Sequence, residues 1–277
     1  MRIGAAAGLW VMLTVGPVAA RESPPACKDE ARQDRLAGIT AEGDLVLGSE
    51  RLARLAGIRL PDDSHHRQQA LDWLKLRVGE PLVVSIQGDR DRWDRRPLRA
   101  RLGPAQAGGP SQRLDLAHGL VEAGLAFVDP GADPVFCQPE LLALEETARE
   151  RRLGLWADGR YNPILADQTE RLKERVGSFV IVEGRVRSVG ERKQRTYLNF
   201  GGHWAEDFTI IIPRKTWMQM AGRGFSAASL TGRALRARGI LQSWQGTALA
   251  VDLPEMIERL EGEGLQGSRD EDKRLAR

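Results

Sequence analysis

Short apolar runs separated by turn residues constrain the fold of this chain more than any other feature. Each run is bounded by Gly, Ser or charged residues, which is typical of strands in a meander. We expect five such strands at residues 35–40, 44–48, 52–58, 81–87 and 98–102. Apolar residues recur at helical spacing in 64–78, 114–123 and 139–152. Five strands and three helices in this order predict a closed five-stranded Greek-key barrel of the OB type.

A second group of short apolar runs follows residue 177. Strands are expected at 179–189, 196–200, 207–212, 233–241 and 248–251, with one helix at 214–221. This order predicts a second, small OB-like β-barrel. The fold class is therefore mainly β with helices (α+β), and a length of 277 residues favours two domains.

The first twenty residues have the layout of a secretory signal peptide. Arg2 is their only charge, an apolar run covers residues 3–15, and small residues precede a cleavage site after Ala20. A retained membrane anchor is the alternative, although the segment is short for a bilayer span. We expect an exported protein in the periplasm or outside the cell, with no stable membrane anchor after cleavage.

The remaining chain divides by composition. We expect an amino-terminal arm at 21–34, a first domain at 35–156, a polar linker at 157–176, the second domain at 177–260 and a disordered charged tail at 261–277. Cys27 and Cys137 are the only cysteines, and after export both would meet an oxidising compartment. A disulfide between them is the favoured interpretation, and two free thiols are the alternative.

Positive charge is concentrated in the second domain. Residues 177–260 contain twelve Lys and Arg against seven Asp and Glu, whereas residues 21–176 contain twenty-four against twenty-six. Small barrels often bind single-stranded nucleic acid by combining basic residues with aromatic faces. Alternatively, the aromatic side chains fill the barrel and the arginines face water. The candidate nucleic-acid-binding residues are Arg185, Arg187, Tyr197, Arg236, Arg238 and Trp244.

Three motifs of the first domain occur in the order and spacing of a known family. They are EGDL at 42–45, RLAGIRLPD at 54–62 and DRWDR at 91–95. These motifs resemble D-G-D-T, R-L-x-G-I-D-x-P-E and D-R-Y-G-R of the staphylococcal nuclease family. Residues 119–126 and 148–156 are similar to later landmarks of that family, so the resemblance covers about residues 35 to 156. It implies a barrel of five strands supported by three helices.

The resemblance also implies roles for individual residues. In the family two carboxylates hold a calcium ion, two arginines bind the phosphate, and a Glu activates water. By position, Asp44 matches the first calcium ligand and Asp62 stands where the base belongs. Arg54 and Arg95 match the two phosphate-binding arginines. A hard cation, a phosphate and an attacking water require these residue types.

Arg59 stands where the family has its second metal carboxylate. A guanidinium there removes a ligand and repels a divalent cation, by an energy on the order of 4 kcal/mol for two unit charges about 4 Å apart. Arg59 could instead pair with Asp44 and occupy the place of the metal. We therefore expect calcium as cofactor if the site is active and none if it is degenerate, with calcium-dependent hydrolysis impaired or lost.

Two classes of function remain open. One is an exported phosphodiesterase or endonuclease, active or with an altered metal, that acts on single-stranded DNA or RNA. The other is a non-catalytic module that binds nucleic acid or another component of the cell envelope. The sequence predicts no oligomeric state.

Overall fold

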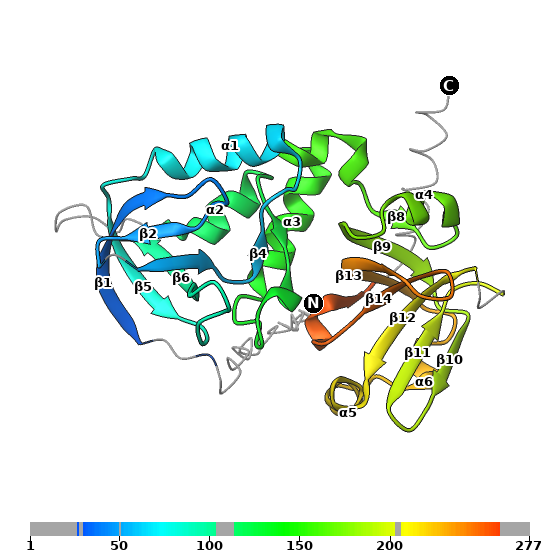
Figure 1. Cartoon of the computed structure of the whole chain (residues 1–277). Helices are drawn as coiled ribbons and strands as arrows, with labels where there is room; N and C mark the ends of the chain where they lie inside the picture. Colours follow the sequence, from blue (N-terminus) through cyan, green and yellow to red (C-terminus); the bar gives the residue numbers. More distant parts are fainter. Residues whose placement is uncertain (1–26, 28–29, 50, 104–113, 203–205, 261–277) are drawn as a thin grey trace, which may run out of the picture.

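The computed structural model describes residues 27, 30–49, 51–103, 114–202 and 206–260 (Figure 1). The expected signal peptide at 1–20, the charged tail at 261–277 and most of the arm at 21–34 lie outside these residues. Among the helices of the described ranges, none combines the length and apolar character that crossing a bilayer requires.

The first unit is a closed barrel of five strands, as predicted. The strands pair in the order β1-β2-β3-β6-β5, and all neighbours are antiparallel except β3 and β6. The barrel closes because β1 pairs with β5 through its first half and with β2 through its second half, across a register shift between Leu36 and Gly38. The barrel strands are β1 (Ala31–Ile39), β2 (Leu45–Leu47), β3 (Leu52–Leu55), β5 (Pro81–Ile86) and β6 (Arg96–Leu102).

Three helices support the barrel: α1 (Ser64–Lys75), α2 (Leu116–Glu122) and α3 (Glu140–Glu150). Their buried faces, including Leu74 and Leu120, join the barrel core around Leu36 and Leu45. A two-stranded ribbon of β4 (Ile58–Arg59) and β7 (Phe127–Val128) continues from β3. A short 3-10 turn, η1 (Pro130–Ala132), follows it. This ribbon brings the loop after residue 128 beside the turn that precedes β4, where the amide of Asp129 donates to the carbonyl of Gly57 at 2.9 Å.

The second unit contains the strands and the helix that the sequence predicts, with additions. Its path of paired strands runs β10-β11-β12-β14-β13-β9-β8, and β15 also pairs with β13. Most of its core residues are apolar strand residues such as Val180, Phe208 and Leu249. Its elements are β8 (Ile164–Leu165), α4 (Thr169–Glu174), β9 (Phe179–Arg185), β10 (Ser188–Glu191), β11 (Arg195–Asn199), β12 (Phe208–Pro213), α5 (Arg214–Gly222), α6 (Ala227–Leu230), β13 (Ala234–Ser243), β14 (Thr247–Ala250), η4 (Pro254–Met256) and β15 (Ile257–Arg259).

The prediction that the second unit is a closed barrel is wrong. The path of paired strands has two ends, at β8 and β10. The expected strand at 179–189 is broken into β9 and β10 at Val186 and Arg187. The amide of Val186 donates to the carbonyl of Arg233, whereas the amide of Arg187 donates to that of Asn199. The chain therefore changes pairing partner within two residues, and the alternating apolar pattern of this segment does not reveal the break.

The segment at 157–176, expected as a polar linker, is integrated into the second unit. Gly154–Ala157 and Gly159–Tyr161 form 3-10 turns, η2 and η3, before β8 and α4. Strand β8 pairs in parallel with β9, and Ile164 and Leu172 are buried in the core of the second unit. A separate apolar cluster joins the two units, and it includes Phe127, Trp156 and Phe179.

Candidate functional site

A cleft of about 460 Å³ opens on the first unit. Its walls come from the turn between β1 and β2, from β3 and β4, and from the turn between β5 and β6. The catalytic and metal candidates predicted from sequence all line this cleft: Asp44, Arg54, Asp62 and Arg95. Arg59 lines it as well.

Asp44 is placed by a tight turn that begins at Thr40. Its amide donates to the Thr40 hydroxyl at 3.1 Å, and Gly43 before it adopts a φ of +92°. A Cβ atom at Gly43 would lie 2.3 Å from Leu60, so only glycine fits this position without displacement. Burial raises the pKa of Asp44 above its usual range, and the guanidinium of Arg95 opposes this shift.

Arg95 lies between two carboxylates. Its Nε and Nη2 atoms are 2.9 and 2.8 Å from Asp91, while its Nη1 is 3.2 and 3.3 Å from the two oxygens of Asp44. Asp91 also accepts the amides of Trp93 and Arg95, which fixes the turn. Burial opposes the ionisation of Asp91, but these hydrogen bonds outweigh it and lower its pKa. Asp91 therefore holds Arg95, and Asp44 is the more distant partner.

Arg54 is held in place by the loop that follows β7. Its Nη2 donates to the carbonyl of Ala132 at 3.0 Å and to Asp133 at 2.5 Å. The other oxygen of Asp133 accepts the amide of Gly57 at 2.9 Å. Gly57 has a φ of +75°, and a Cβ there would lie 2.9 Å from Phe136. Asp133 thus links the orientation of Arg54 to the turn that precedes β4.

Arg59 does not pair with Asp44, which corrects the expectation from sequence. Its Nε donates to Asp129 at 2.8 Å, and its guanidinium lies 5.5 Å from the ring centre of Phe179 in the second unit. The reason is the ribbon between β4 and β7, which places Arg59 beside the segment that carries Asp129. Arg59 is therefore directed toward the junction of the two units.

Asp62, the candidate base, lies at the edge of the cleft. Its side chain is 69% exposed, and its closest charged partner among the described residues is Arg67 at 3.5 Å. It follows Pro61, whose carbonyl accepts a hydrogen bond from Arg67 Nε at 2.9 Å. The carboxylate is accessible to water, but no described contact orients it closely.

The residues at the predicted calcium position do not fit that ion. Calcium takes six to eight oxygen ligands, with carboxylates as the main anchors. Here the carboxylate of Asp44 already accepts from Arg95, and Arg59 supplies a cation where the second carboxylate is expected. Within the described ranges, no group of three or more His, Cys, Asp or Glu side chains is arranged to hold a metal. The charged residues lining the cleft are balanced in number: Arg54, Arg59, Arg67 and Arg95 with Glu42, Asp44, Asp62 and Asp91.

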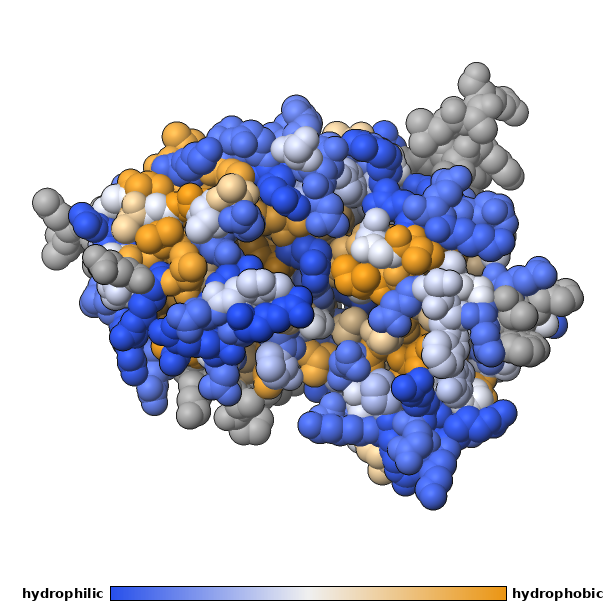
Figure 2. Space-filling view, viewed as in Figure 1, coloured by the Kyte–Doolittle hydropathy of each residue, from blue (hydrophilic) through white to orange (hydrophobic). Residues whose placement is uncertain are grey.

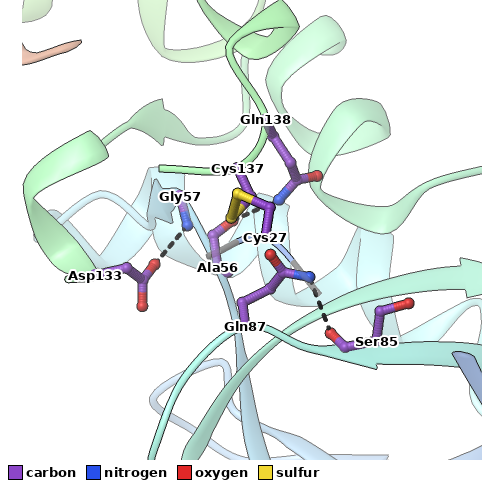
Figure 3. The surroundings of a disulfide bond; sticks show 8 residues. All are labelled: Cys27, Ala56, Gly57, Ser85, Gln87, Asp133, Cys137 and Gln138. Atoms are coloured by element: carbon purple, nitrogen blue, oxygen red, sulfur yellow. Dashed lines mark hydrogen bonds between the residues drawn. A yellow bond between two sulfur atoms is a disulfide. The ribbon is translucent and has the colours of Figure 1, made fainter. Parts of the chain in front are cut away.

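The predicted disulfide between Cys27 and Cys137 is present (Figure 3). It lies beside the turn of Ala56 and Gly57. Gln138, the neighbour of Cys137, donates to the carbonyl of Ala56 at 3.2 Å. The bond therefore ties the amino-terminal arm to the loop that also carries Asp133.

The nucleic-acid candidates of the second unit fall into two groups. Arg185, Arg187 and Trp244 are exposed, and Tyr197 is half-buried. The guanidinium of Arg195 lies 5.9 Å from the ring centre of Trp244. The end of this unit that carries α5 and the β10–β11 turn is strongly hydrophilic in Figure 2.

Arg236 and Arg238 do not face solvent, and this corrects their placement on an accessible surface. Arg238 is 1% exposed and donates to Glu145 of α3 at 2.5 Å, to the carbonyl of Val128 at 3.2 Å and to Glu258. Arg236 binds Glu183 at 2.8 Å and also Glu146 of α3. Both arginines attach the second unit to the first because their carboxylate partners come from both units. The alternating sequence pattern of β13 can place Arg236 and Arg238 on one face of the sheet, but it cannot reveal that buried glutamates face them there.

Three aspartates of the site were not identified from sequence: Asp91, Asp129 and Asp133. Each holds one of the cleft arginines. Asp91 opens the DRWDR motif, which was a usable signal, because an Asp at the start of a turn can accept its amides. Asp129 and Asp133 each stand directly before a proline of the loop, and nothing in the local sequence indicates that they form ion pairs. Only the three-dimensional return of the loop after β7 brings them to the cleft.

Comparison with known proteins agrees with this geometry. Residues 53–158 match the family described as Staphylococcal nuclease homologue, so the chain contains a domain of the staphylococcal nuclease family. A probable endonuclease of Schizosaccharomyces pombe is 31% identical over 119 residues, which cover 39% of this chain and 50% of that protein. The chain thus spans about half the length of this relative. The family match ends at residue 158, before β8 begins.

Proposed function

We propose that the cleft binds the phosphodiester backbone of nucleic acid and that calcium-dependent hydrolysis is lost or strongly impaired. One observation carries the proposal. Both parts of the expected metal site are committed elsewhere, Asp44 to Arg95 and Arg59 to Asp129. The arginines that match the phosphate-binding pair, Arg54 and Arg95, nevertheless line the same cleft.

Arg54 and Arg95 are both held by aspartates, and their guanidinium groups keep donors that a phosphate can accept from. Arg95 is held through its closer contacts with Asp91, so a phosphate oxygen can replace the more distant Asp44 at Nη1. Trp93 is 56% exposed at the rim, with the guanidinium of Arg92 3.9 Å from its ring centre. An exposed indole beside arginines is a suitable platform for a nucleobase.

The binding proposal is tested with a fluorescently labelled single-stranded oligonucleotide. We expect salt-dependent binding by the wild type and about tenfold weaker binding by Arg95→Gln, since a charge-assisted contact to phosphate is lost. Arg90→Gln is the matched control, because Arg90 lies in the same turn, pairs with Asp94 and does not line the cleft. Equal binding by the two variants, or no binding by the wild type, would contradict the proposal.

The loss of calcium binding is tested by titration calorimetry. The wild type should show little calcium affinity, and Arg59→Asp should create measurable binding by placing a carboxylate where the family has its second metal ligand. Arg59→Ala separates the two effects, because it removes the cation without adding a ligand. Tight calcium binding by the wild type would overturn the proposal. Adding Asp62→Glu to Arg59→Asp should then raise cleavage of the oligonucleotide.

A slow phosphodiesterase is the second candidate function. It is favoured by the accessible carboxylate of Asp62 at the cleft and by the similarity to a protein described as a probable endonuclease. In this alternative Asp62 deprotonates a water while Arg54 and Arg95 stabilise the charge on the phosphate. Cleavage by the wild type in a chelator, abolished by Asp62→Asn, would establish it.

Export is also part of the proposed function. The disulfide between Cys27 and Cys137 supports it, because such bonds persist in oxidising compartments. Expression of the full chain in a bacterium with a periplasm should yield a mature protein that begins at Arg21. Mass analysis of the amino terminus and of the cell fraction checks this expectation.

The second unit is proposed to follow the OB plan in an opened form and to add a nucleic-acid surface. If β9 and β10 are counted as one broken strand, they form with β11 and β12 the first three strands of the OB order, α5 and α6 follow, and β13 and β14 are the last two, with β8 and β15 as additions. Arg185, Arg187, Tyr197 and Trp244 remain available on its surface. Trp244→Ala should weaken oligonucleotide binding if a base stacks there, and unchanged binding would remove this surface from the proposal.

A further inference from the structure

A second, smaller cavity of about 170 Å³ lies where the two units meet. It shares Arg59, Leu60 and Asp62 with the cleft of the first unit. Its other walls include Arg175, Ser178 and Phe179, which belong to the part of the chain beyond the family match. A nucleic-acid strand that is bound in the cleft and continues past Arg59 therefore reaches a pocket that the second unit completes.

Two arginines of this pocket have hydrogen-bond donors to spare. Arg59 uses only Nε, toward Asp129, and its terminal nitrogens have no hydrogen-bond partner among the described residues. Arg175 donates through Nη1 to the carbonyl of Arg160 at 3.3 Å, whereas its Nε is buried and has no partner within the described ranges. No described carboxylate lies within ion-pair distance of Arg175. Buried, unsatisfied donors are unfavourable, and an anionic oxygen would satisfy them.

The remaining lining suits a nucleotide better than an isolated anion. Phe127, Tyr161 and Phe179 form a cluster of aromatic rings, with centres 5.6 Å apart for Phe127 and Tyr161 and 5.2 Å apart for Phe127 and Phe179. The acidic residues of the pocket are Asp62 and Asp63, and Asp63 already caps α1 by accepting the amides of His65 and His66. Arg59, Arg160 and Arg175 therefore face these two carboxylates, with Arg160 already paired to Asp158, beside an apolar wall that can contact a sugar or base.

We infer that this junction pocket is a subsite for the nucleotide that flanks the one in the cleft, with Arg59 and Arg175 binding its phosphate. The inference rests on the proposed binding of nucleic acid in the cleft. It gives the departure at Arg59 a role, because the residue that displaces a metal carboxylate becomes the contact between the two sites. It also makes the second unit part of the binding site.

The test measures the affinity of the full protein for an oligothymidylate of about eight nucleotides over a range of salt concentrations. Arg175→Ala should weaken binding about tenfold and reduce the slope of log K against log salt by about 0.7, the contribution of one phosphate contact in a single strand. Lys173→Ala is the control, because this variant removes the same charge two residues away. Lys173 pairs with Glu170 and does not line the pocket. Thymidine dinucleotide, a probe with a single phosphodiester for the cleft, should bind the wild type and Arg175→Ala equally.

The outcomes separate this inference from the proposed function. If the wild type binds neither probe, the proposed function itself fails. If it binds the longer strand but Arg175→Ala and Lys173→Ala behave alike, the junction pocket is not a subsite. If Arg175→Ala also weakens the dinucleotide, Arg175 acts on the cleft as a whole and the flanking subsite is wrong. Thermal unfolding of each variant checks that the fold is retained.

Discussion

The cleft and the interface between the units both contain pairs of arginine and carboxylate, but the pairs at the interface are more deeply buried. In the cleft, Arg54, Arg59 and Arg95 each contact an aspartate, and their side chains are 20%, 36% and 22% exposed. At the interface, Arg236 and Arg238 contact glutamates and are 10% and 1% exposed. Both regions are rich in arginine, yet only the first leaves donors accessible to a ligand.

This difference separates binding from assembly. An exposed guanidinium can exchange a carboxylate for a phosphate because water solvates both groups during the exchange. A buried one cannot, since removing either partner leaves a charge without compensation in a medium of low polarity. The basic character of the second unit in the sequence therefore overstates its capacity for nucleic acid, because two of its arginines serve the interface.

The largest expected effect comes from removing a buried arginine. Arg238→Met leaves Glu145, which is fully buried, without its cation and should lower the free energy of unfolding by about 3–5 kcal/mol. Urea denaturation measures the change. Arg185→Met on the neighbouring strand is the matched control, because Arg185 is exposed and its loss should change stability by less than about 0.5 kcal/mol.

A second variant shows whether charge or shape is responsible. Glu145→Gln removes the unpaired carboxylate but keeps an oxygen that can accept the amide of Val128, which Glu145 binds at 2.7 Å. Combined with Arg238→Met it should recover part of the lost stability, a coupling expected for residues in direct contact. Losses that simply add would mean that Arg238 stabilises by packing alone, and the contrast with the cleft would disappear.

Acidification should affect the interface through Glu146. Burial opposes its ionisation, but Arg149 and Arg236 outweigh burial and lower its pKa below the ordinary 4.5. An acid with a lowered pKa contributes stability that is complete above 4.5 and is lost as the pH falls through the pKa of the folded state. The stability of the wild type should therefore fall below pH 4.5 more steeply than that of Glu146→Gln. Parallel curves in urea denaturation at pH 3 to 6 would show that Glu146 is not coupled to these arginines.

Much of the first unit could be predicted from sequence because its determinants are local. The turn residue Gly43, the helical spacing in α1 and the alternation in the barrel strands act over a few positions each. The gathering of Asp44, Arg54, Asp62 and Arg95 followed from the motifs. Their partners did not, because Asp129 and Asp133 reach the cleft only through the pairing of β4 with β7.

The second unit shows the same limit more clearly. Most of its strands could be placed from apolar patterns, but β8 and β15 were missed, and the break at Val186 and Arg187 depends on which strand each amide meets. The burial of Arg238 depends on Glu145, which lies on a helix of the other unit. A charged residue on a strand carries no local sign of such a partner. Sequence therefore located most of the elements, whereas the ion-pair partners of the charged residues could be assigned only from the structure.

The smallest expected effect concerns Asp62, the exposed carboxylate shared by the cleft and the junction pocket. Asp62→Asn should change the free energy of unfolding by less than about 0.5 kcal/mol, because the side chain is 69% exposed and its contact with Arg67 is at 3.5 Å. Removing its negative charge should raise the affinity for a single-stranded oligonucleotide about two- to threefold at low salt, and screening should remove most of this gain at high salt. Asp72→Asn is the control, since Asp72 is similarly exposed on α1 but lines neither cavity. Weaker binding by Asp62→Asn would mean that Asp62 positions an arginine for the phosphate rather than repelling it, and the cleft would then resemble the interface more than its exposure suggests.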